Sequence, residues 1–213
     1  MVEMKLRILS IEREYGSGGA RIASELASRL GWKLWDHALT EEIAKLARVS
    51  PAAAERHDER PDPLLYRLAK VFARGSYERS IPVDDANVFD AERMVALLCQ
   101  VIERVGAEGD CVIVGRGAPY ILRSRPDAFH VFIYAPREVK IHRITTLGKS
   151  EAEAADLVDT IDKERAAFIK QYFGADWPTR YLYNLWINSA VGDSATVETI
   201  LQAMKLHEQF RQD

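Results

Sequence analysis

The chain has 213 residues, with 29 Lys and Arg against 32 Asp and Glu, and a formal net charge of −3 at pH 7. Hydrophobic residues make up 47% of it, which is enough for one sizeable core and argues against long disorder. A polymeric nucleic acid usually requires a basic face, and the sequence has no dense Lys/Arg run, so we expect no such partner. A small anionic substrate needs only a few arginines.

Cysteine usage and hydropathy predict a cytoplasmic protein. Cys99 and Cys111 lie in apolar runs without C-x-x-C spacing, which predicts buried free thiols and suits a reducing cytosol. Residues 1–10 lack the apolar region of a signal peptide, and no stretch approaches the roughly 18 apolar residues of a membrane span. The histidines show no ligand spacing, so we expect no protein-bound metal.

The first elements predicted are a strand, a glycine-rich loop and a helix. Residues 6–11 form an apolar run typical of a short strand, and residues 12–19 interrupt it with three glycines. Apolar residues then recur at i, i+3, i+4 and i+7 from Ala23 to Leu30, which predicts one buried helix face ending at Gly31. This order opens many α/β nucleotide-binding folds.

The rest of the chain alternates between predicted strands and helices. Thr40 and the Ser50-Pro51 pair each predict a helix start, and we interpret the polar, proline-interrupted residues 60–87 as a helical flap. Further strands are predicted at residues 33–35, 111–114, 129–134 and 186–188, and further helices at residues 91–105 (closed by Gly106), 136–146, 150–172 and 196–210. The alternation predicts a three-layer α/β fold, a parallel sheet with helices on both faces.

The glycine loop is a candidate phosphate site. In residues 13–21, R-E-Y-G-S-G-G-A-R, backbone N–H groups and the following helix start would hold phosphate oxygens, and glycines allow positive φ and close approach. The candidate phosphate-binding residues are Gly16, Ser17, Gly18, Gly19, Ala20 and Arg21. The alternative is a tight turn without a ligand, and the position after the first strand favours phosphate.

The loop departs from the pattern G-x-x-x-x-G-K-[ST]. With Gly18 as its last glycine, Arg13 stands at the first glycine and Gly19 at the lysine, so the lysine is missing. The dinucleotide pattern G-x-G-x-x-G is also absent. We expect an arginine to supply the missing charge, with Arg13 the first candidate and Arg21 the second. The alternative is that both pair with Glu12, Glu14 or Glu25 on the surface.

Several segments resemble the bacterial cytidylate kinase-like proteins, which belong to the P-loop nucleoside monophosphate kinase superfamily. They are residues 10–19 (S-I-E-R-E-Y-G-S-G-G), 112–118 (V-I-V-G-R-G-A), 172–177 (Y-F-G-A-D-W) and 185–188 (L-W-I-N). The resemblance covers nearly the whole chain. It implies one P-loop kinase domain with a core at about residues 1–36, 108–148 and 180–213, a substrate-binding flap at 37–107 and a lid at 149–179.

The resemblance also indicates candidate substrate residues. The G-R-D motif of true cytidylate kinases resembles residues 115–117, where Arg116 is kept and Gly117 replaces the aspartate. Their lid motif R-D-x-x-D-x-x-R resembles residues 158–165, which keep Asp159, Asp162 and Arg165 and lose the first arginine. Their D-S pair resembles Asp36-His37.

Each of these residues also has a structural alternative. Asp162 and Arg165, at i and i+3 on the 150–172 helix, would then form an ordinary boundary salt bridge. Arg116 would be a surface-loop arginine, Arg143 would share a solvated helix face with Lys140, and His37 would pair with Asp36. The aromatic residues between positions 172 and 186 are more typical of core or lid packing than of base stacking.

Together these features favour a nucleotide-dependent phosphotransferase. ATP would bind the loop, and Mg²⁺ would arrive bound to the nucleotide, with Ser17 or a water molecule close to it. The acceptor would be a nucleoside monophosphate such as CMP. Asp36, His37, Arg116 and Asp162 would bind the acceptor, and Arg13, Arg143 and Arg165 would stabilise the transferred charge. The alternatives are a catalytically weak nucleotide-binding or regulatory protein and a kinase of a non-nucleotide metabolite. The oligomeric state is not predicted.

Overall fold

The computed structural model describes residues 5–36, 38–39, 42–43 and 91–210. His37, the helices predicted to start at Thr40 and Ser50, and the predicted flap residues 60–87 lie outside the described residues. No helix in the described part of the chain is both long and apolar enough to cross a bilayer.

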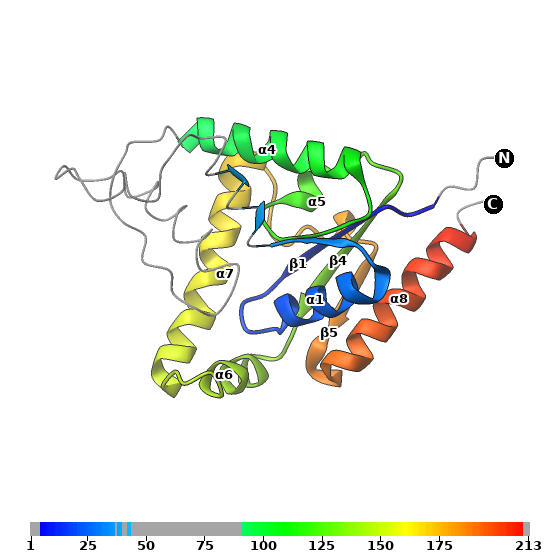
Figure 1. The fold of residues 1–213 in the computed structure, drawn as a ribbon. Helices are drawn as coiled ribbons and strands as arrows, with labels where there is room; N and C mark the ends of the chain where they lie inside the picture. The colour runs from blue at the N-terminus through cyan, green and yellow to red at the C-terminus, as the bar shows by residue number, and fades with distance from the viewer. Residues whose placement is uncertain (1–4, 37, 40–41, 44–90, 211–213) are drawn as a thin grey trace.

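A five-stranded parallel sheet forms the middle layer (Figure 1). Its order is β2-β3-β1-β4-β5, which places β1 at the centre. The strands are β1 (Ile8–Arg13), β2 (Lys33–Trp35), β3 (Cys111–Val114), β4 (Ala128–Tyr134) and β5 (Leu185–Asn188). The carboxyl ends of all five strands therefore meet at one edge, where open α/β sheets bind ligands.

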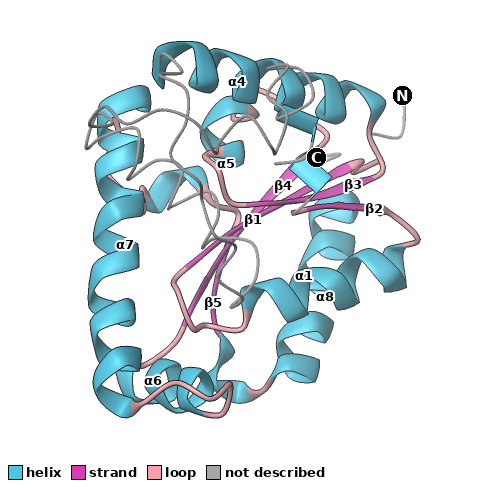
Figure 2. Cartoon of the chain, turned by 60° about the vertical axis from the view of Figure 1, so that its left-hand side comes forward, coloured by secondary structure: helices cyan, strands magenta, loops and turns pink. Residues whose placement is uncertain are grey.

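Helices cover both faces of the sheet, as Figure 2 shows, and this confirms the predicted three-layer α/β fold. The helices α1 (Gly19–Leu30) and α8 (Asp193–Phe210) pack on one face, and α4 (Ala91–Glu108), α5 (Ala118–Ile121) and α7 (Glu151–Phe173) pack on the other. The helix α6 (Arg137–Thr145) follows β4 and packs against α7. Short 3₁₀ turns, η2 (Arg180–Leu182) and η3 (Ser189–Val191), flank β5.

The central strand β1 extends further than the predicted residues 6–11. It continues through Glu12 and Arg13, which pair in register with Phe132 and Ile133 of β4 and are almost fully buried. The prediction ended the strand too early because charged residues rarely occupy a strand buried on both faces. Side chains alternate along the strand, so Glu12 and Arg13 lie on opposite faces of the sheet.

The helix α4 also extends beyond its predicted end. Gly106 was predicted to close it, but the helix continues to Glu108, and Gly109, at φ 73°, follows it. Gly106 is instead a close-packing position, since a Cβ there would lie 2.9 Å from Leu122 Cδ2. The start of α7 confirms Ser150 as the N-cap of the predicted capping box, because Ser150 Oγ accepts a hydrogen bond from the Glu153 N–H at 3.2 Å; the Glu153 side chain pairs with Lys149.

Both cysteines are free, as predicted, although Cys99 is only half-buried. Cys111 is buried at the start of β3, and burial raises the pKa of its thiol to about 12. It is therefore a packing residue rather than a nucleophile.

A buried polar pair joins β1 to β4. Ser10 and His130 are directly opposite each other, and Ser10 Oγ lies 2.6 Å from His130 Nδ1. Burial lowers the pKa of His130 to about 4, so the imidazole is neutral at pH 7. A protonated ring at this position would have to carry its charge inside the sheet.

This pair predicts an acid-sensitive fold. The unfolded chain binds a proton at His130 below pH 6.5, whereas the folded chain binds it only near pH 4. The contribution of His130 to stability is therefore fully present above pH 6.5 and is lost as the pH falls toward 4. Urea unfolding should show a decrease of about 2 kcal/mol in the free energy of unfolding between pH 7.5 and pH 5 from this group. A His130→Gln variant should lose that part of the slope; an unchanged slope would assign the acid sensitivity elsewhere.

Candidate phosphate-binding and acceptor site

The loop between β1 and α1 has the backbone of an anion-binding turn. Gly16 and Gly18 adopt φ values of 77° and 80°, which favour glycine, and Ser17 Oγ donates to the Glu14 carbonyl at 2.8 Å. Within the described residues, no protein group accepts a hydrogen bond from the backbone N–H of Gly16, Gly18, Gly19 or Ala20. The loop therefore presents several N–H donors at the start of α1, an arrangement suited to phosphate oxygens.

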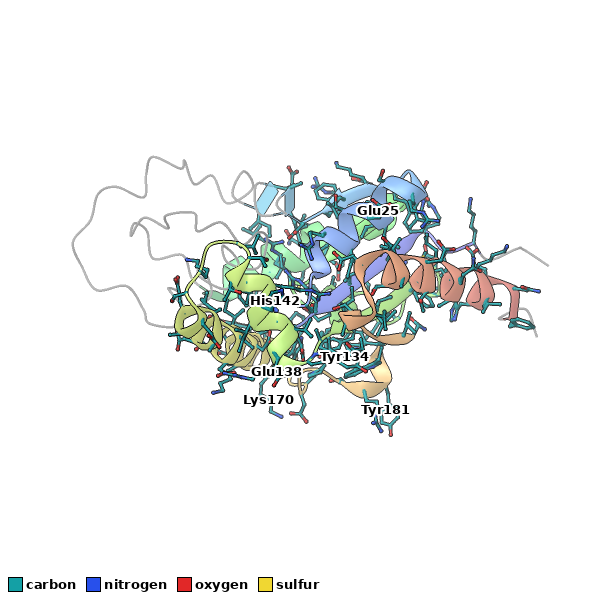
Figure 3. All side chains as sticks on the ribbon, turned by 90° about the horizontal axis from the view of Figure 1, so that it is seen from below. Glu25, Tyr134, Glu138, His142, Lys170 and Tyr181 are labelled. Carbon is teal, nitrogen blue, oxygen red and sulfur yellow. The ribbon has the colours of Figure 1, made fainter. Side chains whose placement is uncertain are left out.

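Side chains of α6 and η3 hold the loop through one carbonyl. The Ser17 carbonyl accepts from Arg143 Nη1 at 2.7 Å and from Ser189 Oγ at 2.6 Å. Arg143 Nη2 also donates to the Ser189 carbonyl at 2.8 Å. Arg143 and Lys140 thus face inward, while Glu138 and His142 lie on the exposed side of α6 (Figure 3). The alternative of a solvated face shared by Arg143 and Lys140 is therefore wrong.

The helix α7 holds the loop from the other side. Arg165 Nη1 donates to the Arg13 carbonyl at 2.7 Å, and Asp162 Oδ1 accepts from the Tyr15 N–H at 2.8 Å. The two side chains also contact each other at 3.0 Å, which confirms the predicted pair. Lys140 Nζ lies 2.8 Å from Glu14 Oε2 and 3.6 Å from Asp162 Oδ2, so it joins the loop to α7 through two ion pairs. The pair is not an ordinary boundary salt bridge, because it binds the backbone of a distant loop.

The turn after β3 carries a buried arginine. Gly115, Arg116 and Gly117 follow one another with φ values of 70°, 58° and 72°, and Arg116 is one of two non-glycine residues in the described chain with positive φ. Its Nη1 donates to the Asp36 carbonyl at 2.7 Å and lies 3.7 Å from the Asp36 carboxylate. Burial lowers the pKa of Arg116 to about 10, and Asp36 partly opposes this shift. A strained residue kept in such a turn is a feature of functional sites.

Arg13 lies between the loop and this turn. A Cβ placed on Gly19 would lie 2.7 Å from Arg13 Cγ, and one placed on Gly115 would overlap Arg13 Nη1. Nη1 also lies 3.5 Å from Glu12 Oε1, and both side chains are buried. Arg21, in contrast, is largely exposed and pairs with Asp193 at 3.0 Å. Of the alternative surface pairs, Arg13 does form the one with Glu12, but in the interior rather than at the surface, and Arg21 pairs with Asp193 instead.

Three buried arginines therefore gather at the carboxyl ends of β1 and β3. Burial lowers the pKa of Arg165 as well as that of Arg116, and the positive charge of Arg13 contributes to both shifts. Burial also raises the pKa of Glu12, while Arg13 and Arg165 oppose this rise. Lowered arginine pKa values mean that the protonated guanidiniums are under-compensated, which is the state that a bound anion would relieve.

The structure brings most of the predicted residues to one edge of the sheet. Asp36 and Arg116 are in contact, and Arg13, Arg143, Asp162 and Arg165 all lie against the glycine loop. Sequence reasoning missed the role of Glu12 as a buried carboxylate, and the only available signal was a charged residue beside an apolar strand. It also missed the contacts of Lys140 and Ser189, which lie far from the loop in sequence.

Most of the aromatic residues between positions 172 and 186 pack together, as predicted, but Tyr181 does not and is 93% exposed. Phe132 contacts Trp177, Tyr183 and Trp186 with ring centroids 5.6, 5.2 and 4.6 Å apart. The predicted lid segment is thus joined to β4 and to the core, and Tyr181 extends outward from η2 (Figure 3).

Solved structures with a similar fold include kinases. An uncharacterized protein from Eubacterium ventriosum ATCC 27560 superposes with a TM-score of 0.68 at 21% identity, over 94% of this chain and 99% of that one. A gluconokinase from Sinorhizobium meliloti 1021 gives 0.52 at 14% identity, over 97% and 95%. A shikimate kinase from Bacteroides thetaiotaomicron gives 0.51 at 16% identity, over 96% and 98%. No curated protein matches the sequence.

The parallel sheet, the glycine loop after β1 and these superpositions define a P-loop kinase fold. The chain belongs to the cytidylate kinase-like family, whose model matches residues 8–191. The family resemblance inferred from the sequence is thereby confirmed.

The lost aspartate at position 117 has a steric explanation that is testable. A Cβ on Gly117 would lie 2.7 Å from Phe173 Cε2, and the residue has a φ of 72°. Gly117→Asp should therefore lower the free energy of unfolding by about 2 kcal/mol or more, through the clash and the backbone strain together. Denaturant unfolding measures this loss.

Gly148→Asp is the matched control, because Gly148 has a φ of 92° and nothing within 4 Å of its Cβ position. It reports the backbone cost alone. Equal losses in the two variants would mean that Phe173 leaves room for an aspartate.

Proposed function

We propose that this protein transfers the γ-phosphoryl group of ATP to a small acceptor, a nucleoside monophosphate such as CMP. The observation that carries the proposal is the glycine loop, several of whose backbone N–H groups have no acceptor among the described residues, beside three arginines with buried side chains. Phosphoryl transfer depends on positioning and electrostatic stabilisation rather than on a protein nucleophile, and this combination supplies both. Membership of the cytidylate kinase-like family supports the same reaction class.

In this proposal the loop residues bind the ATP phosphates through their backbone. Gly16, Gly18, Gly19 and Ala20 offer N–H groups, while the Ser17 side chain is already bonded to the Glu14 carbonyl. Arg21 lies in the first turn of α1 and pairs with Asp193 at the edge of the loop. A cation in the first turn of a helix is disfavoured by the helix dipole unless an anion binds nearby.

The arginines divide into two proposed roles. Arg165 lies at the junction of the loop with α7 and would balance charge on the transferred group. Arg143 bonds to the Ser17 carbonyl and to Ser189, behind the loop, so we assign it a positioning role instead of direct contact with the transferred group. A conformational error of about 1 Å in such a loop is costly for phosphoryl transfer.

The acceptor would bind beside the turn after β3. Arg116 and Asp36 lie there. Asp162, which accepts from the Tyr15 N–H at the loop, and His37, next to Asp36 in the sequence, remain proposed acceptor contacts. An acceptor phosphate would compensate the buried positive charge of Arg116, whereas a neutral acceptor would not.

Magnesium would enter with the nucleotide in this proposal. No group of three or more His, Cys, Asp or Glu gathers around a cation position in the described part of the chain, and Ser17 Oγ is already a donor within the loop. Bound to the triphosphate, Mg²⁺ would neutralise phosphate charge, and the protein would hold the complex through the loop N–H groups.

A screen of nucleoside monophosphates tests the acceptor. With ATP and Mg²⁺, CMP or another nucleoside monophosphate should give ADP release well above the rate without acceptor. Gly18→Val should abolish both turnover and ATP binding in isothermal titration, because Gly18 has a φ of 80° and its Cβ would lie 3.3 Å from Asp193 Oδ1 and 3.4 Å from Arg143 Nη1, so a valine would distort the loop. Gly31→Val is the matched control: it also changes a left-handed glycine next to α1, but in open space.

Unchanged ATP affinity in a folded Gly18→Val variant would place the nucleotide elsewhere. ATP binding without turnover on any nucleoside monophosphate would favour a different acceptor. The substitution of the G-R-D aspartate by Gly117, with Phe173 in its space, is the observation that favours a non-nucleotide acceptor in that case. Binding without turnover on any small hydroxyl or phosphate acceptor would favour a regulatory role.

The segment that includes α7 is proposed as a lid, and hydrogen exchange tests this. Its contacts with the loop, through Arg165 and Asp162, should tighten when nucleotide and acceptor bind together. Amide exchange along α7 should slow at least about threefold with a non-hydrolysable ATP analogue plus CMP, and the C-terminal half of α8 is the internal control. If α7 exchanges at the same rate with and without ligands, it is part of a static scaffold.

A further inference from the structure

The strongest feature outside the proposed roles is the relation between Arg13 and the two glycines that its side chain crosses. Gly19 is not in the left-handed region, so its backbone does not require glycine. A Cβ at this position would nevertheless lie 2.7 Å from Arg13 Cγ and 2.9 Å from Arg13 Cβ. The absence of a side chain at position 19 is therefore explained by the space that the Arg13 side chain occupies.

The same side chain explains Gly115 at its other end. The guanidinium lies where a Cβ of Gly115 would be, at the start of the turn that carries Arg116. Arg13 thus extends from the phosphate loop to the acceptor-side turn, across the carboxyl ends of β1 and β3. In a standard loop, the lysine would start at position 19 and use this same space.

We propose that Arg13 and Gly19 have exchanged the usual places of cation and glycine, so that Arg13 contacts the ATP phosphates from the end of β1. The inference rests on the proposed function, since it presumes a nucleotide in the loop. A guanidinium at this place would bind phosphate through two N–H groups, which a lysine ammonium cannot present in the same plane.

The other arginines around the loop are less suited to this role. Arg21 is 60% exposed in its side chain and is held by Asp193. Arg165 and Arg143 lie at the carbonyls of Arg13 and Ser17, and Arg116 lies at the Asp36 carbonyl, so these contacts do not place any of the three beside Gly19. Arg13 is also the arginine whose side chain contacts Gly19 directly.

The steric part of the proposal is tested without nucleotide. Gly19→Ala should lower the melting temperature in the parent, because its Cβ meets Arg13, and should be tolerated in an Arg13→Ala background. A double-mutant cycle on these four proteins measures the coupling. If the changes in melting temperature of the two single variants simply add in the double variant, the two positions do not share space. That result would overturn the proposed exchange of cation and glycine between positions 13 and 19.

The electrostatic part is tested by ATP titration of folded variants. Arg13→Ala should weaken ATP binding about 10- to 100-fold, as for other hydrogen bonds to charged groups. Gly19→Lys alone should also bind poorly, because two long side chains would meet. The double variant R13G/G19K should recover affinity to within about tenfold of the parent, since it restores the first glycine and the lysine of the standard loop, while Ala20 still stands at its Ser/Thr position.

Two controls make each outcome decisive. Arg29→Ala removes an exposed arginine of α1 that pairs with Glu198, and should leave ATP affinity unchanged. Arg13→Lys keeps the charge and should bind ATP better than Arg13→Ala, which decides the question if R13G/G19K does not fold.

ATP affinity equal to that of the parent in Arg13→Ala overturns the inference and leaves the proposed function standing. If the parent protein binds no ATP, the proposed function is wrong, and so is the phosphate role of Arg13. In that case the melting-temperature cycle still decides whether Gly19 is small because of Arg13.

Discussion

The shape of the glycine loop depends on hydrogen bonds that distant side chains make to its backbone. Arg143 and Ser189 donate to the Ser17 carbonyl. From α7, Arg165 donates to the Arg13 carbonyl, and Asp162 accepts from the Tyr15 N–H. With its carbonyls occupied from outside, the loop turns its N–H groups toward the carboxyl edge of the sheet. The placement of α6, α7 and η3 follows from this requirement as much as from burial of apolar surface.

The charges that hold the loop are costly to bury, and the fold compensates them in pairs. Glu12 lies beside Arg13, Asp36 beside Arg116, and Asp162 beside Arg165. Burial still lowers the pKa of Arg116 and of Arg165, although Asp36 and Asp162 oppose the shifts. Buried pairs of this kind contribute little net stability and are retained where geometry or ligand binding requires them.

Much of the fold was predictable from local patterns, because apolar periodicity, Gly31 and the Ser150 capping box are short-range signals. The end of β1 and the end of α4 were not, since Glu12 and Gly106 owe their places to partners far along the chain. The same limit applies to the site. The loop, Arg116 and the Asp162–Arg165 pair could be predicted, whereas the inward orientation of Arg143 depends on Ser189, 46 residues away.

The crowding between Arg13 and Gly19 also constrains how a loop of this type could arise from the lysine-containing one. Position 13 must gain an arginine and position 19 must lose a lysine. If the arginine comes first, two long side chains compete for one space; if the lysine is lost first, the loop has no cation at either position. Under the proposed phosphate role of Arg13, the second route would weaken phosphate binding for a time but would never place two long side chains in one space.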